Sequence, residues 1–171
     1  MIVGDREYRY EVAEGWGQLP TGRTYGDVTG LGTDSQDRVY VFTRPAHPVI
    51  VFDTDGHFLG SWGEGTIRRA HGLTVTPDDV VWLTDEGDHT VRKYTLDGRL
   101  LQTLGTPGQC SDTGYVGVRG AGYLRTIRRG AGPFNEPTKV AVALTGDLYI
   151  TDGYGNARVH RFSADGTLLQ S

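Results

Sequence analysis

The fold is decided by residues 72–101, which read GLTVTPDDVVWLTDEGDHTVRKYTLDGRLL. A short apolar run at 72–75 is followed at 81–85 by a segment of residues that favour β-strands. An Asp-Gly pair at 97–98 then stands between Tyr94 and the apolar pair at 100–101. Because Asp-Gly between apolar segments favours a tight hairpin turn, this stretch predicts four short antiparallel strands.

The same pattern occurs three times along the chain. Asp-Gly pairs at 55–56, 97–98 and 165–166 each follow an aromatic residue by three positions, at Phe52, Tyr94 and Phe162. The second pair comes 42 residues after the first, whereas the third comes after 68 residues, so an insertion of 26 residues separates the last two units. A repeat of about forty residues with four strands is typical of a propeller blade.

The repeat divides the single predicted domain, residues 1–171, into an N-terminal segment, three blades and one insertion. The fold class is therefore all-β, with four-stranded antiparallel blades that form part of a propeller of six blades. The predicted ranges are 1–25 for the N-terminal segment, 26–65, 68–108 and 135–171 for the blades, and 107–134 for the insertion.

Composition supports this class and excludes several others. Glycine accounts for 26 of 171 residues, about twice the usual share, which indicates many tight turns and argues against long helices. No run approaches the ~20 apolar residues of a membrane-spanning helix, so no membrane association is expected. A net charge of −4 argues against nucleic acid as a partner.

The single cysteine, Cys110, has no partner for a disulfide within the chain, and neither a thiolate nucleophile nor a cysteine-based zinc cluster is expected. The first six residues, MIVGDR, do not read as a signal peptide. These two observations do not decide the cellular compartment of the protein, although they favour the cytoplasm.

Three blades cannot close a ring, and the sequence ends within its third repeat unit. The chain is therefore expected to be a piece of a longer propeller or a half-propeller that pairs with a second copy as a homodimer. Unpaired blades would expose apolar side chains of the short inner strands, which favours self-association. These are Val28, Leu31, Leu73, Val75, Val140 and Val142.

Several motifs resemble the NHL-repeat propellers and, among them, bacterial relatives of peptidyl-α-hydroxyglycine α-amidating lyase. The resemblance covers nearly the whole chain and about the first half of a six-bladed family member. It rests on GWGQLP at 15–20, VTGL at 28–31, VFTR at 41–44, AHGL at 70–73, FNEPTKVAV at 134–142 and DGYGNARV at 152–159.

The resemblance implies a zinc-dependent reaction that splits a peptidyl-α-hydroxyglycine into a peptide amide and glyoxylate. His71 would be the first of three zinc ligands, Tyr154 the catalytic tyrosine, and Arg44 the residue that holds the substrate carboxylate. Backbone carbonyls of Leu31 and Leu73 would bind a structural calcium ion. The other two zinc histidines would follow Ser171, so the lone chain is expected to be inactive and to bind zinc weakly.

A simpler interpretation of each residue stays open. His71 would be a structural histidine, Tyr154 a turn aromatic, and Arg44 part of a surface ion pair, so that the chain is a non-catalytic binding or assembly module. Asp85 and Asp152 match each other in the repeat and are expected to hold turns by hydrogen bonds. Structural or solvated roles are expected for His47, His57, His89 and His160.

The insertion carries a local excess of positive charge. Between Thr113 and Asn135 there is no acidic residue but four arginines, namely Arg119, Arg125, Arg128 and Arg129. Such a loop either binds an anionic or carboxylate ligand or is simply solvated. The sequence leaves both alternatives open.

Overall fold

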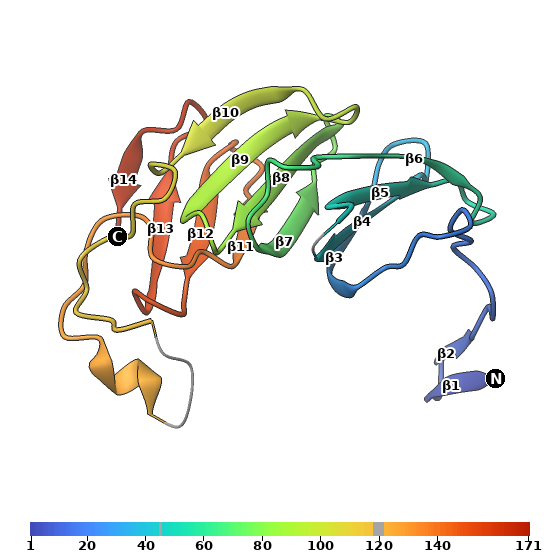
Figure 1. Ribbon diagram of the computed structural model, residues 1–171, viewed down its shortest axis with the longest axis horizontal. Helices are drawn as coiled ribbons and strands as arrows, with labels where there is room; N and C mark the ends of the chain where they lie inside the picture. The colour runs from blue at the N-terminus through green and yellow to red at the C-terminus, as the bar shows by residue number, and fades with distance from the viewer. Residues whose placement is uncertain (45, 118–121) are drawn as a thin grey trace.

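The computed structural model describes residues 1–44, 46–117 and 122–171. Three four-stranded antiparallel sheets follow one another along an arc (Figure 1). The all-β class and the propeller architecture predicted from the repeats are therefore confirmed. Among the described residues, the helical structure is one short 3-10 turn, η1 (Tyr123–Thr126), within the insertion.

Each sheet consists of four consecutive strands in chain order, and we number the sheets as blades 1 to 3. Blade 1 contains β3 (Asp27–Thr33), β4 (Val39–Arg44), β5 (Val49–Phe52) and β6 (Phe58–Trp62). Blade 2 contains β7 (Ala70–Val75), β8 (Val80–Asp85), β9 (Thr90–Thr95) and β10 (Leu100–Leu104). Blade 3 contains β11 (Lys139–Val142), β12 (Leu148–Asp152), β13 (Arg158–Phe162) and β14 (Leu168–Gln170). A separate ribbon near the N-terminus pairs β1 (Ile2–Asp5) with β2 (Tyr8–Glu11).

The Asp-Gly pairs form the turns between the last two strands of each blade. Gly56, Gly98 and Gly166 have φ angles of 84°, 88° and 92°, in the left-handed region that a residue with a Cβ rarely adopts. Glycine at these positions therefore lets each blade turn back into its outermost strand.

Alternation along the strands places apolar side chains on both faces of blade 2. One core joins blades 1 and 2 and includes Tyr40, Phe42, Leu73 and Leu83. A second core joins blades 2 and 3, where Trp82 and Val91 belong to the same cluster as Leu148, Ile150 and Phe162. Apolar burial between the blades is thus the main force that fixes their arrangement.

The inner strands β3, β7 and β11 contact one another along the inside of the arc. Their close approach requires glycine: a Cβ at position 30 would lie 2.8 Å from the Leu73 nitrogen, and a Cβ at position 72 would collide with the Thr138 carbonyl oxygen. The two glycines therefore let β3 approach the middle of β7, and β7 approach the residue just before β11.

The outer face of blade 1 is covered by the segment that precedes it. Val41, Ile50 and Phe52 form a third core with Leu19 and Tyr25 packed against it. The Trp16 ring lies 5.5 Å from the Phe52 ring, and the backbone of Gln18 bridges that of His57. Residues 16–25 thus take the place that another blade would occupy in a ring.

Exposure of the inner strands is more limited than the sequence predicts. Val28 and Leu31 are exposed, but Leu73 and Val140 are buried because neighbouring blades cover them. The continuous apolar patch expected from the six inner residues is therefore not formed. Among the described residues, no helix is both long and apolar enough to cross a bilayer.

Candidate functional site

Three side chains singled out from the sequence lie at the same end of neighbouring blades, and two of them, His71 and Tyr154, contact each other. Arg44 is the last residue of β4, His71 the second residue of β7, and Tyr154 follows β12. The Nε2 atom of His71 lies 3.1 Å from the Tyr154 hydroxyl oxygen, and the two rings meet edge to face with centroids 5.3 Å apart. Residues from all three blades thus contribute to one cluster.

A backbone carbonyl fixes the tautomer of His71. Its Nδ1 atom lies 2.9 Å from the Thr138 oxygen, which can only accept a hydrogen bond. Nδ1 therefore carries the hydrogen. In the neutral ring, the Nε2 lone pair accepts a hydrogen bond from the Tyr154 hydroxyl. A histidine that donates from one nitrogen to a backbone carbonyl has its tautomer fixed, as metal-binding histidines usually do; in His71 the Tyr154 hydroxyl occupies the other nitrogen, so a metal ion there would replace that hydrogen bond.

Glu86 connects His71 to Arg44, although the sequence analysis did not single it out. Its side chain is only 1% exposed. The Oε1 atom accepts hydrogen bonds from Arg44 Nη2, at 2.9 Å, and from Arg69 Nε, while Oε2 lies 4.0 Å from His71 Nε2. One buried carboxylate therefore holds two guanidinium groups beside the histidine.

The repeat contains a signal that could have identified Glu86. Strand register aligns Thr43, Asp85 and Asp152, so the next residues, Arg44, Glu86 and Gly153, are also equivalent. Adjacent blades thus place opposite charges at the same strand end. Because neighbouring blades lie side by side, such a pair predicts an ion pair across the blade boundary.

The two aspartates have the scaffold roles expected from the repeat. The Asp85 carboxylate accepts hydrogen bonds from the backbone nitrogens of Arg68 and Arg69, at 2.7 and 2.9 Å. The Asp152 carboxylate accepts from the Asn135 nitrogen and lies 3.1 Å from His160 Nε2. Both carboxylates therefore fix the segment that leads into their own blade.

The remaining histidines lie elsewhere and have local partners. His160 is fully buried between Asp152 and Ser171, His47 contacts Glu64, and His89 accepts a hydrogen bond from the Glu136 nitrogen. His57 contacts Asp53 in the first Asp-Gly turn. Of the two roles expected for His160, structural or solvated, the structure shows the structural one, because its side chain is buried.

Asp53, Asp55 and His57 form the group of three ligand-type side chains found close together among the described residues. The turn itself explains their proximity, because Asp53 Oδ1 accepts from the backbone nitrogens of Asp55 and His57. The hydrogen bonds from His57 lower the pKa of Asp53, and the Asp53 carboxylate raises the pKa of His57.

Zinc and calcium, the two ions implied by the resemblance, differ in how well the residues fit them. His71 fits a zinc ligand because its tautomer is fixed and its Nε2 lone pair faces the cluster. The Leu73 carbonyl does not fit a calcium ligand, because its oxygen accepts a 2.6 Å hydrogen bond from the Lys139 ammonium. A positive charge at that distance would repel Ca²⁺, so no role is derived for calcium at Leu73 or Leu31.

The arginines of the insertion do not join this cluster in the described part of the chain. Arg119 lies outside the described residues. Arg129 forms an ion pair with the Asp112 carboxylate, which immediately precedes the acid-free stretch, and its Nε donates to the Asp112 carbonyl at 3.1 Å. The Asp112 carboxylate thus neutralises part of the positive charge predicted for the insertion.

The single cysteine of the chain, Cys110, also lies in the insertion, where its free thiol is exposed.

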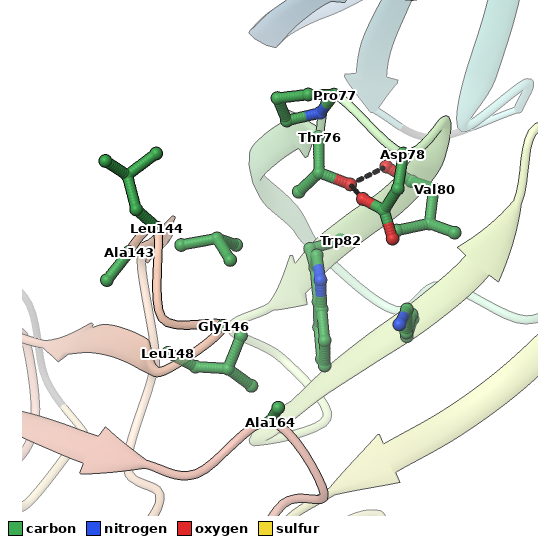
Figure 2. Close-up of a pocket in the computed structure, with 12 residues that line it drawn as sticks. Thr76, Pro77, Asp78, Val80, Trp82, Ala143, Leu144, Gly146, Leu148 and Ala164 are labelled. Atoms are coloured by element: carbon green, nitrogen blue, oxygen red, sulfur yellow. Dashed lines mark hydrogen bonds between the residues drawn. The ribbon is translucent and has the colours of Figure 1, made fainter.

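A cavity lies at the opposite ends of the strands, between blades 2 and 3. Between blades 1 and 2, the Ser35 nitrogen and hydroxyl both bind the Asp79 carboxylate, at 2.9 and 2.6 Å. The equivalent residues of blades 2 and 3, Pro77 and Gly146, lack these groups, and a cavity of about 410 Å³ opens beside Trp82 (Figure 2). Of its charged residues, Asp78 accepts the Thr76 hydroxyl, as Figure 2 shows. This cavity offers shape but no cluster of reactive side chains.

Sequence comparisons identify the repeat. The NHL repeat model matches residues 68–94 and 134–162. The human NHL repeat-containing protein 3 is 34% identical over 174 residues, which cover 95% of this chain and 45% of that protein. The mouse protein of the same name is 38% identical over 142 residues, covering 77% of this chain and 36% of that protein. Drosophila melanogaster peptidyl-alpha-hydroxyglycine alpha-amidating lyase 1 is 38% identical over 111 residues, covering 63% of this chain and 17% of the lyase. The chain spans less than half the length of these relatives.

Solved structures share the fold at low sequence identity. The Staphylococcus aureus virginiamycin B lyase gives a TM-score of 0.60 at 18% identity, covering 88% of this chain and 42% of that one. A streptogramin B lyase structure gives a TM-score of 0.59 at 18% identity, covering 84% and 39%. At this identity the likeness establishes the propeller fold alone.

Proposed function

We propose that this chain, which carries NHL repeats of a β-propeller and is related to the peptidyl-α-hydroxyglycine α-amidating lyases, contributes the first part of a zinc-dependent lyase site. The observation that supports the proposal is the meeting of His71, Tyr154 and the Arg44–Glu86 pair at one place. These residues come from three blades and lie far apart in the sequence.

The residue types suit the cleavage of a peptidyl-α-hydroxyglycine. In this reaction the substrate hydroxyl loses its proton, the carbon–nitrogen bond breaks with its electrons moving to nitrogen, and the nitrogen gains a proton. The products are a peptide amide and glyoxylate. Tyr154 would take the hydroxyl proton, and the Arg44 guanidinium would hold the carboxylate. Zinc, when bound at His71, supplies a Lewis acid that lowers the pKa of the substrate hydroxyl.

Catalytic zinc sites normally use three protein ligands. Among the described residues, His71 is the one histidine of this cluster. We therefore expect the 171-residue chain to bind zinc weakly and to release no glyoxylate, and the complete site to need ligands from further blades.

The activity test compares two proteins with N-benzoyl-α-hydroxyglycine as substrate. A complete propeller that contains this region should release glyoxylate and benzamide in equal amounts when zinc is present, and Tyr154→Phe should abolish most of this release. The 171-residue chain should release none above buffer. Absence of zinc-dependent release from the complete propeller would contradict the lyase proposal, and release by the short chain would contradict the expected need for further ligands.

A second candidate, a non-catalytic assembly module, is supported by the free face of blade 3. Tyr149 and Val159 are exposed there, although the equivalent Tyr40 and Val49 of blade 1 are buried against blade 2. The occupant we propose is a second copy that completes the ring. The segment 16–25 covers the blade 1 face that would meet it and would have to move. A dimer in light scattering that Val159→Glu dissociates would support this candidate, whereas a monomer at high micromolar concentration would contradict it.

A further inference from the structure

The cavity between blades 2 and 3 has the size and the lining of a site for a small apolar molecule. Its volume of about 410 Å³ falls within the range of about 300–1,000 Å³ that is usual for ligand sites. The Trp82 indole lines it from blade 2, and Leu144 and Leu148 line it from the β11–β12 hairpin of blade 3 (Figure 2). The walls therefore favour an apolar ligand.

Lys93 adds a positive charge to this apolar lining. The residue is half-buried, and its Nζ atom lies 5.7 Å from the centroid of the Trp82 ring. Within the described part of the chain, its ammonium group has no ion-pair partner and no hydrogen-bond acceptor. Asp78 also lines the cavity, but it is exposed and accepts the Thr76 hydroxyl. Because water solvates Lys93 less fully than Asp78, the positive charge gains more from a bound counter-ion.

The equivalent cation of blade 3 has an acidic partner. In blade 2, Lys93 lies opposite Trp82 in the neighbouring strand. Arg161 lies opposite Tyr149 in the same way in blade 3. Its guanidinium lies over the Tyr149 ring and forms an ion pair with Asp147. Blade 3 thus balances the charge of its cation with an acid of its own.

Val80 stands in blade 2 at the position of Asp147 in blade 3, because each residue comes two positions before the aromatic residue of its strand. Its apolar side chain lines the cavity and cannot form an ion pair with Lys93. Blade 2 therefore keeps the cation and the aromatic ring but lacks the acid, and it has a cavity beside them. A carboxylate carried by a ligand would supply the missing charge.

We propose that this cavity binds a small apolar carboxylate, whose acidic group contacts the Lys93 ammonium and whose apolar part lies against Trp82 and the β11–β12 hairpin. The ligand carboxylate would take the part that Asp147 plays in blade 3. The site lies at the opposite ends of the strands from His71, so it does not depend on the proposed lyase function. Because the ligand would contact both blades, its binding should also stabilise their packing.

The test compares 3-phenylpropionate with its neutral analogue 3-phenylpropionamide in NMR titrations of the 171-residue chain. The phenyl group suits the apolar walls, and the two probes differ only at the charged end. The acid should bind about tenfold more tightly than the amide, the change expected for one hydrogen bond to a charged group. Binding should also shift the indole N–H resonance of Trp82, which lines the cavity.

Two variants remove the unpaired positive charge in different ways. Lys93→Met deletes the ammonium group, and Val80→Asp supplies the acid that blade 3 has at this position. Each should remove most of the preference for the acid over the amide. Arg161→Met is the matched control, because it deletes the equivalent cation of blade 3, and it should leave the preference unchanged. Melting temperatures should show that the variants are folded.

Equal affinity for the two probes, or a preference that persists in a folded Lys93→Met variant, would overturn the site. If Lys93→Met does not fold, an unchanged preference in Val80→Asp would overturn it in the same way. A preference that Arg161→Met abolishes would place the acid on the exposed face of blade 3, which also contradicts the proposal.

Discussion

The Nε2 atom of His71 lies 3.1 Å from the hydroxyl oxygen of Tyr154, although the two residues are 83 positions apart in the sequence. The Thr138 carbonyl determines that Nε2 is the nitrogen without hydrogen. An imidazole lone pair and a phenol therefore face each other at a blade boundary, beside a buried carboxylate that holds two arginines.

The neutral His71 ring should carry its hydrogen on Nδ1. We expect long-range ¹H–¹⁵N spectra to give an Nε2 resonance typical of an unprotonated nitrogen, and Tyr154→Phe should shift that resonance because the hydroxyl donor is lost. A ring with its hydrogen on Nε2 would contradict the assigned hydrogen bonds.

Replacing Glu86 should weaken the fold as well as the site. Glu86→Gln leaves Arg44 and Arg69 without their shared charge partner. Breaking a buried ion pair costs about 3–5 kcal/mol, but the Arg69 side chain is half exposed, so we expect a loss of about 2 kcal/mol in the free energy of unfolding. The exposed Glu14→Gln variant is the control and should change stability by less than about 0.5 kcal/mol. Equal urea midpoints for the two variants would argue against the described role of Glu86.

The close approach of the inner strands gives a steric prediction. Gly72→Ala places a methyl group against the Thr138 carbonyl and should destabilise the protein by about 1–3 kcal/mol, as overpacking does. Gly60→Ala is the matched control, because a Cβ at that strand position meets no atom within 4 Å. Thermal melts that show the same stability for both variants would mean that β7 and β11 are further apart than described.

The Asp34 carboxylate should make the stability of the fold depend on pH. Burial acts to raise the pKa of its carboxyl, but hydrogen bonds from the Arg38 side chain, the Gln36 and Arg38 amides and the Tyr40 hydroxyl outweigh burial and lower it. A lowered pKa stabilises the fold above the unfolded value of about 3.9, and this contribution is lost as the pH falls through the folded pKa. The gap in melting temperature between the wild type and Asp34→Asn should therefore be largest near neutral pH and shrink below about pH 4. A gap that is constant with pH would show that the ionised carboxylate is not responsible.

Calcium should not stabilise this chain. The Leu73 carbonyl oxygen already accepts a hydrogen bond from the Lys139 ammonium. Millimolar CaCl₂ is therefore expected to give the same melting temperature as EDTA. Lys139→Met removes that ammonium and should itself lower the melting temperature. A clear rise in wild-type stability on adding calcium would contradict the assignment of Lys139.

The sequence predicts the fold well because the determinants of the blades are local. The Asp-Gly turns and the alternation within each strand depend on near neighbours, so sequence alone places Gly56, Gly98 and Gly166 in tight turns. Glu86 is harder to predict because its role depends on Arg44 from another blade and on burial. The covering of Phe52 by Trp16 is likewise a tertiary contact, with no periodic pattern to mark it.

The most direct test of the account is a zinc titration followed through the histidine side-chain ¹⁵N resonances of the 171-residue chain. We predict that zinc shifts the Nε2 resonance of His71 first and that His71→Gln removes this weak binding, while His57→Gln does not. A titration in which zinc perturbs His57, beside Asp53 and Asp55, and leaves His71 unchanged would contradict the claim that His71 belongs to a zinc site.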